Sequence, residues 1–360
     1  LNTHHRYAVP AFTPVLLNLS LIGAMLFAAG AFAEPVFALA WGVLFAGVAQ
    51  FLFQLPALKT LGLIVAPQVS LEHAGARRVG KLLVPAVFAA SVNQINALID
   101  TMLASTLLTG SISWLYYSDR LLELPVGLVA VTLGTVLLPN LSRLDSEANL
   151  TGFAATLDWG LRVGVVFGLP AAVALYVLAL PLISTIFMHG ATTPIDARMA
   201  ALALQAFAVG LVPLVLVKVL APGYFAREDT RTPFRIGLIS VGTNVVLNLA
   251  LFRVMGHVGL ALATSAAACV NAYLLWRGLD RIGRFRIGRL SVQTVLRCAA
   301  AVAAMAAVLL WTTPEDARWL EASVLGRTFW LLRSVAAGGL VYLAAIWLLG
   351  GRVAHLKHLA

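Results

Sequence analysis

The sequence predicts an all-α fold, a polytopic integral membrane protein built as a helical bundle of about ten transmembrane helices. Three observations predict it. Of the 360 residues, 61% are apolar and only 11% are charged, against about 45–50% and about 25% in soluble domains. The charges also gather in short gaps between long apolar runs. These proportions exclude a soluble globular domain and a disordered chain, and two cysteines are too few for a disulfide scaffold.

The apolar runs set the positions of the helices. A helix of roughly 20 apolar residues crosses about 30 Å of hydrocarbon and satisfies its own backbone hydrogen bonds there. The sequence lacks the alternating pattern that is typical of barrel strands. It therefore predicts spans at 9–32, 36–57, 82–108, 112–139, 156–179, 199–221, 235–252, 256–276, 294–312 and 330–350.

The basic residues predict the orientation. Of the 25 lysines and arginines, 18 fall in one alternating set of gaps and 5 in the other, while Arg120 and Arg162 lie inside spans. Cytoplasmic loops carry the excess of basic residues, so we expect both chain ends on the cytoplasmic side. Because the net charge of +10 sits in these gaps, we expect membrane lipids, and no nucleic acid, around the basic loops.

Two gaps are unusually long or basic. Residues 59–80 end in Arg77 and Arg78, and we expect them to lie on the cytoplasmic surface as a short amphipathic linker. Residues 277–297 carry six arginines, which suit an anionic leaflet. Both gaps serve as topology determinants, or alternatively as a lipid or partner site.

The fourth predicted span contains an unusual density of charge. Asp119, Arg120 and Glu123 lie within it, just before Pro125, although an ionisable residue inside a span costs about 2.5–3.5 kcal/mol. An arginine fork fits phosphate. We predict that Arg120 contacts an anion in a hydrated cavity, while Glu123 orients it or competes with the substrate. The alternative is a structural ion pair within the bundle.

A second set of polar residues predicts a cation site. Asp100 lies near the middle of the third span, Asn244 and Asn248 are four residues apart in the seventh, and Thr264 lies in the eighth. Carboxylate, amide and hydroxyl oxygens are hard ligands that suit a small cation. We predict a sodium or proton coupling site, with interhelical hydrogen bonding as the alternative.

Lys218 is a candidate gate residue. It stands at the cytoplasmic end of the sixth span, before a stretch with helix stop, turn and restart signals at 221–233. The alternative is a lysine that extends to the membrane surface beside a tight turn.

The sequence predicts no enzyme activity. Metalloprotease, P-loop and serine-hydrolase motifs are absent, and Cys269 and Cys298 lie in apolar runs that suit packing. A membrane enzyme that acts on polyprenyl phosphates would need acids or histidines in a surface loop. The loop 186–198 offers His189 and Asp196 but no metal or phosphate motif.

Three stretches resemble a known family, the MurJ (MviN) lipid II flippases of the multidrug/oligosaccharidyl-lipid/polysaccharide exporter superfamily. The stretches are SWLYYSDRLLELP at 113–125, VKVLAPGYFA at 217–226 with DTRTP at 229–233, and YAVPAFTP at 7–14 with Asn18. The stretch at 113–125 resembles the family's eighth helix and the stretch at 7–14 its fifth helix. The similarity continues along the whole chain.

The resemblance implies MATE-like transporter lobes with fourteen helices, of which this chain would hold the fifth to the fourteenth. The family's first four helices would then precede Leu1, and we expect a fragment. The implied parts are 1–58, the last two helices of the N-terminal lobe; 59–80, a cytoplasmic inter-lobe linker; 81–290, a six-helix C-terminal lobe; and 291–360, two extra helices that form a lipid-tail groove.

The resemblance also implies the function. Family members move undecaprenyl-pyrophosphate-linked peptidoglycan precursor from the inner to the outer leaflet of the bacterial inner membrane by alternating access. Lipid II is then the substrate, other cell-wall synthesis proteins are candidate partners, and sodium is the one candidate cofactor. Ser113, two turns before Arg120, is expected to line the same cavity. Asp100, Asn244, Asn248 and Thr264 match where family members hold sodium; membrane potential is the rival energy source.

Alternative functions stay open at this point. A polysaccharide-lipid or multidrug exporter of the same fold would share the span pattern, although a drug exporter favours carboxylates in its cavity. A non-transporting scaffold of the cell-wall machinery is a further alternative.

Overall fold

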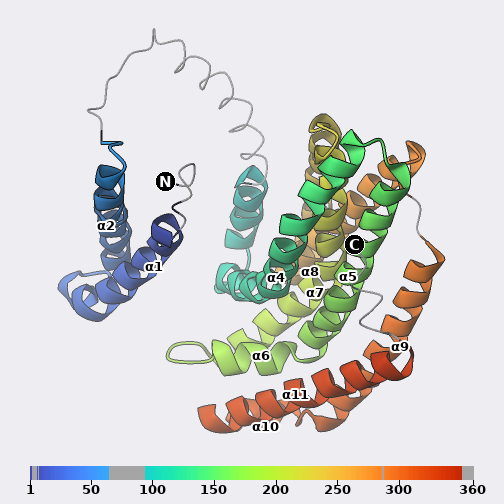
Figure 1. Cartoon of the computed structure of the whole chain (residues 1–360). Helices are drawn as coiled ribbons and strands as arrows, with labels where there is room; N and C mark the ends of the chain where they lie inside the picture. The colour runs from blue at the N-terminus through green and yellow to red at the C-terminus, as the bar shows by residue number, and fades with distance from the viewer. Residues whose placement is uncertain (2–5, 7, 65–93, 286–287, 351–360) are drawn as a thin grey trace. The chain divides into compact units, whose positions relative to one another are not determined.

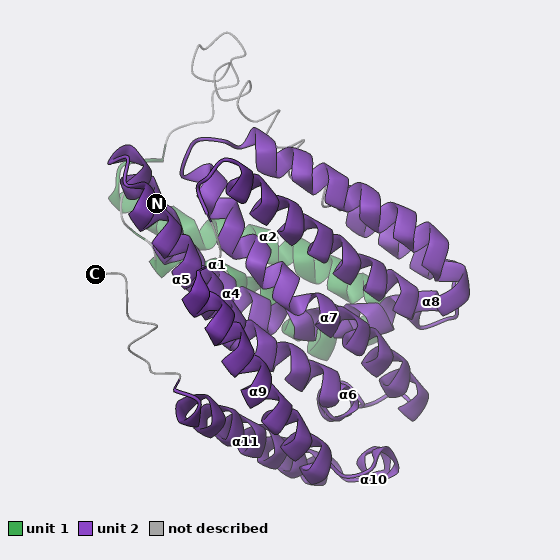
Figure 2. Ribbon diagram, turned by 90° about the vertical axis from the view of Figure 1, so that its right-hand side faces the viewer, with its two compact units in different colours: residues 1–82 green, residues 83–360 purple. Residues whose placement is uncertain are grey.

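The computed structural model describes residues 1, 6, 8–64, 94–285 and 288–350 (Figure 1). Within these ranges the regular elements are helices, and none is a strand. The chain divides into two compact units, Leu1–Leu82 and Leu83–Ala360 (Figure 2). Most of the predicted linker, from 65 to 80, and the first part of the predicted third span, 82–93, lie outside the described residues.

The first unit is a pair of packed apolar helices. Helix α1 (Ala8–Gly23) continues as a short π-helix, η2 (Ala24–Ala28), and a 3-10 helix, η3 (Ala29–Ala31). Helix α2 spans Val36–Thr60. The rings of Phe12 and Phe53 join the two helices with centroids 5.6 Å apart. Gly42 allows the close approach, because a Cβ there would lie 2.9 Å from the Cβ of Ala24.

The second unit is a bundle of long helices with two short ones. Residues 94–105 are helical. The elements that follow are α4 (Ser111–Ser146), α5 (Leu150–Val177), α6 (Ala179–Ile186), α7 (Pro194–Phe225), α8 (Arg231–Arg281), α9 (Arg289–Thr312), α10 (Asp316–Glu321) and α11 (Val324–Leu348).

Helix α8 is a hairpin of two helices. The chain reverses at Gly256, whose φ of 58° and ψ of −137° are not helical. Ser240 donates a hydrogen bond to the Ala267 carbonyl oxygen at 2.9 Å, and Asn244 pairs with Thr264 at 3.2 Å. These pairings show that the two halves run antiparallel, as the separate predicted spans 235–252 and 256–276 require.

Among the described residues, eight helices are long and apolar enough to cross a membrane, and α8 is one of them. The predicted all-α membrane bundle is confirmed. The helix ends differ from the predicted ones: α4 extends to Ser146 and α5 begins at Leu150, because polar residues at the membrane surface continue a helix as well as apolar ones do. The six-arginine gap is also partly helical, in the end of α8 and the start of α9.

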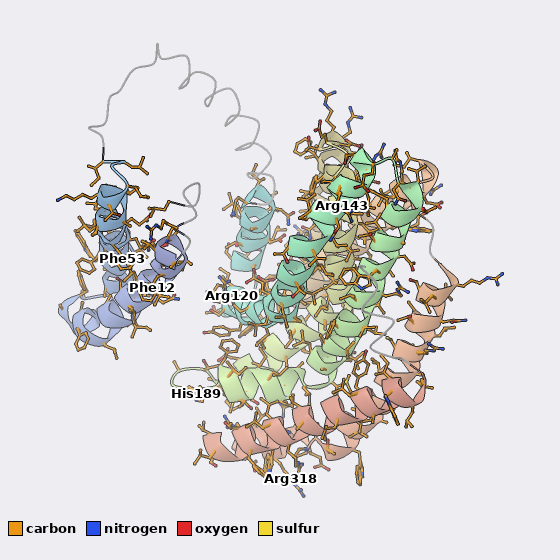
Figure 3. All side chains as sticks on the ribbon, viewed as in Figure 1. Phe12, Phe53, Arg120, Arg143, His189 and Arg318 are labelled. Atoms are coloured by element: carbon orange, nitrogen blue, oxygen red, sulfur yellow. The ribbon has the colours of Figure 1, made fainter. Side chains whose placement is uncertain are left out.

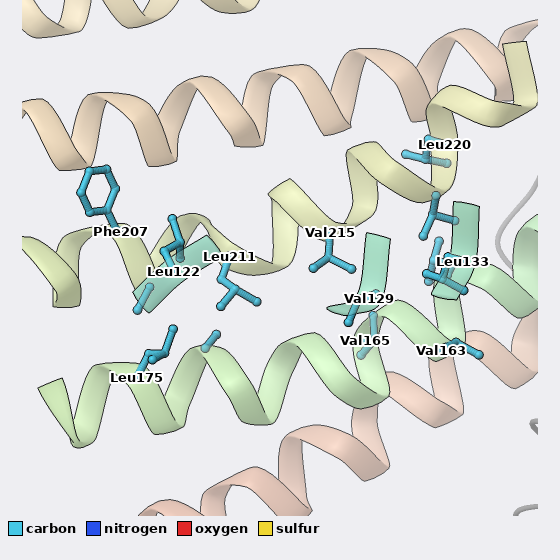
Figure 4. Packing of buried hydrophobic residues seen from close by; sticks show 14 of the residues in the cluster. Leu122, Val129, Leu133, Val163, Val165, Leu175, Phe207, Leu211, Val215 and Leu220 are labelled. Atoms are coloured by element: carbon cyan, nitrogen blue, oxygen red, sulfur yellow. The ribbon is translucent and has the colours of Figure 1, made fainter. Parts of the chain in front are cut away.

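The core of the second unit lies where α4, α5, α7 and α8 meet. Figure 4 shows Leu211 and Val215 of α7 together with Val165 of α5 among the buried apolar side chains of this core. A Cβ at Gly160 or Gly164 of α5 would come within 3.1 Å of α7 side chains. Small residues therefore let the two helices pack closely, as in other membrane bundles.

Helices α9 and α11 form a second hairpin whose ends are capped reciprocally by arginines. Arg333 of α11 donates to the Thr312 carbonyl oxygen at the end of α9, at 2.7 Å. Arg297 of α9 donates to the Gly350 carbonyl oxygen beyond the end of α11, at 3.4 Å. Tyr342 fastens the hairpin to α5 by donating to the Val166 carbonyl oxygen at 2.7 Å.

Candidate substrate and cation sites

One face of α4 is fixed to the start of α7. Gly110 precedes helix α4 as its N-cap, and its φ of 104° and close contact with the Trp114 ring admit only glycine. Trp114 donates a hydrogen bond from Nε1 to Asp196 Oδ1 at 2.8 Å. Asp196 also forms a capping box with Thr193 at the start of α7. These contacts hold the rotation of α4 and so decide which of its side chains remain exposed.

The charged side chains of α4 lie on its exposed side. Ser113, Asp119, Arg120 and Glu123, the predicted substrate residues, are all exposed. Ser113 and Arg120 are two turns apart on the same side of the helix. The structure therefore presents these four side chains together on α4, and Figure 3 labels Arg120 there.

The contacts that Arg120 makes with Glu123 and Tyr116 are exposed and weak. Its Nη1 lies 2.7 Å from Glu123 Oε2, with 54% and 57% of the two side chains exposed. Its guanidinium carbon lies 4.9 Å from the centroid of the Tyr116 ring. An exposed ion pair contributes only about 0–1 kcal/mol. An incoming phosphate could therefore replace Glu123 as the partner of Arg120 at small cost.

The predicted cation residues come together in one polar cluster. Asn248 donates to Asp100 Oδ1 and also to Asn244, the latter at 2.8 Å. Asn244 contacts Thr264 Oγ1 at 3.2 Å. The helical segment 94–105 and both halves of α8 therefore meet at this point, although Asp100 and Asn248 are 148 residues apart in sequence.

The cluster has the chemistry of a cation site. Among the described residues the Asp100 carboxylate forms no ion pair within 4 Å. Asn248 is completely buried, yet its Oδ1 has no hydrogen-bond partner there. An unbalanced carboxylate beside an orphaned buried oxygen is the arrangement that a monovalent cation would complete.

Asn96 is a member of this cluster that the sequence analysis did not identify. Its Nδ2 donates to Asp100 Oδ2 at 3.3 Å. Its Oδ1 faces the amide of Asn244 at 2.9 Å. The signal was present in the sequence, because Asn96 precedes Asp100 by one helical turn, as Asn244 precedes Asn248.

Lys218, the predicted gate residue, is exposed on α7. The loop after α7 is held by other residues: Asp145 at the end of α4 lies 3.9 Å from Arg227 and 3.2 Å from Arg284. Asp229 accepts a hydrogen bond from the Thr232 backbone at 3.0 Å, at the first turn of α8. Hydrogen bonds from Thr232 hold the pKa of Asp229 below its ordinary value.

The loop that a membrane enzyme would use has structural roles. Asp196 is engaged by Thr193 and Trp114, and the His189 ring lies 3.1 Å from the Thr185 carbonyl oxygen. Across the described ranges, no group of three or more histidine, cysteine, aspartate or glutamate side chains could hold a metal ion.

Long apolar helices, a charged helix face and a buried polar cluster define a polytopic membrane transporter. A family model described as "Lipid II flippase MurJ" matches residues 1–330. "Probable lipid II flippase MurJ" of Vibrio cholerae is 44% identical over 357 residues, covering 99% of this chain and 68% of the relative. "Lipid II flippase MurJ" of Burkholderia cenocepacia is 36% identical, covering 100% of this chain and 71% of the relative.

A solved structure agrees with these relatives. "Lipid II flippase MurJ, inward closed conformation" aligns with a TM-score of 0.78 and 27% identity, over 96% of this chain and 68% of that one. The chain belongs to the lipid II flippase MurJ family. Its members are transporters rather than enzymes, and the chain is a multi-pass membrane protein.

Proposed function

We propose that the protein moves lipid II from the inner to the outer leaflet of the bacterial inner membrane by alternating access, with both chain ends in the cytoplasm. Family membership supports lipid II over a polysaccharide lipid or a drug as cargo. The observation that carries the proposal is the exposed guanidinium of Arg120 on a membrane-spanning helix, where it pairs with the exposed carboxylate of Glu123.

The chemistry of the headgroup explains this arrangement. A pyrophosphate cannot enter hydrocarbon unless cationic groups and water shield its charge. The planar fork of Arg120 can donate two parallel hydrogen bonds to a phosphate. Glu123 holds Arg120 until the substrate arrives and then releases it, while Ser113 and Asp119 supply further polar contacts on the same side of α4. When the ion pair between Arg120 and Glu123 forms again, Glu123 would displace the headgroup from Arg120 and help it to leave.

Each part of the chain has its own role in the proposed transport. Residues 1–58 contribute two helices to one lobe, 59–80 link the lobes, and 81–290 form the other lobe. Residues 291–360 hold the lipid tail along the last two helices. The family resemblance supports this assignment, and the α9–α11 hairpin packs on α5 through a separate apolar cluster.

The test is rescue of growth in cells depleted of their own lipid II flippase. We expect the full-length parent gene to restore growth and its Arg120→Ala variant to fail, because a neutral methyl cannot bind pyrophosphate. Arg120→Lys should rescue only in part, since an ammonium lacks the planar fork. Glu123→Ala should slow growth, because the release step is lost.

Helix α4 offers a matched control. Arg143 is also labelled on α4 in Figure 3, is exposed, and pairs with Glu147 at 3.5 Å one turn later. Arg143→Ala should rescue fully at equal membrane abundance. Full rescue by both Arg120→Ala and Glu123→Ala would show that the pair is structural, and failure of the wild type would favour another cargo.

We further propose that the cluster around Asp100 binds sodium. The residues that would hold the ion are Asp100, Asn244, Asn248 and Thr264. A bound cation would supply the positive charge that the half-buried Asp100 carboxylate lacks. Sodium should then raise the unfolding temperature of the purified protein more than equal potassium or choline, and Asp100→Asn should abolish the difference.

Lys218 is proposed as part of a cytoplasmic gate. Its exposed ammonium could pair with a carboxylate when the cytoplasmic side closes. Lys218→Ala should then leave the unfolding temperature unchanged and reduce the rescue of growth. Full rescue would identify Lys218 as a lysine that only reaches the membrane surface.

A further inference from the structure

Four side chains of the polar cluster form a closed ring, here called the amide ring: Asp100, Asn96, Asn244 and Asn248. The Asp100 carboxylate accepts from Asn96 Nδ2 at 3.3 Å and from Asn248 Nδ2 on its other oxygen. Both asparagines then reach the same end of the Asn244 amide, Asn96 at 2.9 Å and Asn248 at 2.8 Å.

The amide ring cannot satisfy all of its hydrogen bonds while Asp100 is ionised. Asn96 points nitrogen at the carboxylate, so its oxygen faces Asn244 and needs a donor there. Asn248 points its nitrogen at both Asp100 and Asn244, so it needs an acceptor at the same place. One end of one amide cannot be both donor and acceptor. Turning any of the three amides moves the mismatch to another contact and does not remove it.

A cation removes the mismatch. When Asn244 turns its oxygen into the ring, that oxygen accepts from Asn248, while its nitrogen lies 3.2 Å from Thr264 Oγ1 and 3.2 Å from the Thr264 backbone nitrogen. The same oxygen then meets the oxygens of Asn96 at 2.9 Å and of Asp100 at 3.3 Å. Three oxygens converge, one of them from a carboxylate. This arrangement is repulsive when empty and suits a small monovalent cation.

We infer that Asn96 is a further ligand of the cation through its Oδ1, and that the amide ring is kept ready for the ion by a hydrogen-bond mismatch that the ion resolves. The inference rests on the proposed sodium site and extends it. This inference changes the proposed ligand set: the ion contacts the oxygens of Asp100, Asn244 and Asn96. Asn248 and Thr264 become positioning residues that hold the Asn244 amide by hydrogen bonds, and the Thr264 hydroxyl also donates to the Leu260 carbonyl oxygen at 3.2 Å.

The inference has a consequence for coupling. Asn96 and Asp100 belong to the segment 94–105, whereas Asn244 and Asn248 belong to the first half of α8. Loss of the cation would turn the three converging oxygens into a repulsive contact between these two elements. Sodium binding should therefore bring segment 94–105 and α8 together, and sodium release should loosen their contact.

The test measures the unfolding temperature of the purified protein in detergent as sodium is titrated at constant ionic strength against choline. We expect Asn96→Ala to raise the half-saturating sodium concentration about 10-fold or more. In choline alone, Asn96→Ala should be at least as stable as the wild type, because the mismatched contact between Asn96 Oδ1 and the Asn244 amide is removed. A simple packing residue would instead lose stability in both salts.

Asn140→Ala is the matched control. Asn140 is a half-buried asparagine of α4 that donates to the Val136 carbonyl oxygen of its own helix at 2.9 Å. Its replacement should leave the sodium response unchanged. An absent sodium response in the wild type would refute the proposed sodium site itself. A wild-type response that Asn96→Ala retains with the same half-saturation would refute only the role of Asn96.

Asn96→Asp keeps the test decisive if the alanine variant does not fold. The second carboxylate increases the negative charge of the ring, so the variant should be less stable in choline and should regain stability in sodium, at a half-saturating concentration no higher than that of the wild type. If sodium gives Asn96→Asp no added stability, Asn96 is not a ligand.

Discussion

Arg327 is the buried charge whose removal should cost the most stability. Only 7% of the residue is exposed, and among the described residues it has no carboxylate within 4 Å. Its Nε donates to the Trp319 carbonyl oxygen and its Nη2 to that of Leu320, both at 2.8 Å. Its Nη1 reaches the Ser184 carbonyl oxygen at 3.4 Å. One guanidinium therefore caps the ends of both α10 and α6.

The cost of Arg327→Met follows from these contacts. Hydrogen bonds to a charged donor contribute about 1.5–3 kcal/mol each, and two of the three are short. The variant should lose about 3–6 kcal/mol of unfolding free energy, because the carbonyl oxygens stay buried without a donor. Arg327→Lys should fall between, since an ammonium reaches one carbonyl cluster but cannot bridge two helix ends.

The assay is unfolding of the purified protein in mixed micelles as the denaturing detergent fraction rises. Arg333→Met is the control, because Arg333 is exposed and also caps a helix end, donating to Thr312 at 2.7 Å; it should cost no more than about 1 kcal/mol. If Arg327→Met and Arg333→Met cost the same, burial of the guanidinium does not set its contribution and the reasoning is refuted.

Two further predictions concern single contacts. Asp229→Ala should cost about 1 kcal/mol, because Thr232 loses its acceptor at the first turn of α8. The pKa of Asp229 is lowered in the folded state, so the wild type should lose this stabilisation as the pH falls through that lowered value. If Asp229→Ala loses the same stability over the same pH range, the loss does not come from Asp229. Gly210→Ala should destabilise the α7–α8 contact, because the added Cβ would lie 2.7 Å from the Ser265 backbone. The displaced Ser265 should lengthen its hydrogen bond to the Ala206 carbonyl oxygen, and the backbone amides of α7 should then exchange hydrogen faster. Unchanged amide exchange and unchanged stability would contradict this prediction.

The sequence alone determined the fold class and the family. In hydrocarbon each segment must satisfy its own backbone hydrogen bonds, so the positions of helices follow from local composition and need no knowledge of neighbours. For the same reason the charges within a span, such as Arg120 and Glu123, could be recognised as exceptional from their positions alone. The two halves of α8 were also separable, because Arg253 and Gly256 interrupt the apolar run.

Only the tertiary structure decided which polar residues meet. The sequence grouped Asp100 with Asn248 by their chemistry and by the family resemblance, but the hydrogen bond between them depends on how segment 94–105 packs against α8. Asn96 entered the cluster for the same reason. Arg327 lay in a predicted gap and is instead buried in α11. Its position in the chain indicates a charge near the membrane surface, whereas its burial depends on where the ends of α6 and α10 come together in space, which no local pattern encodes.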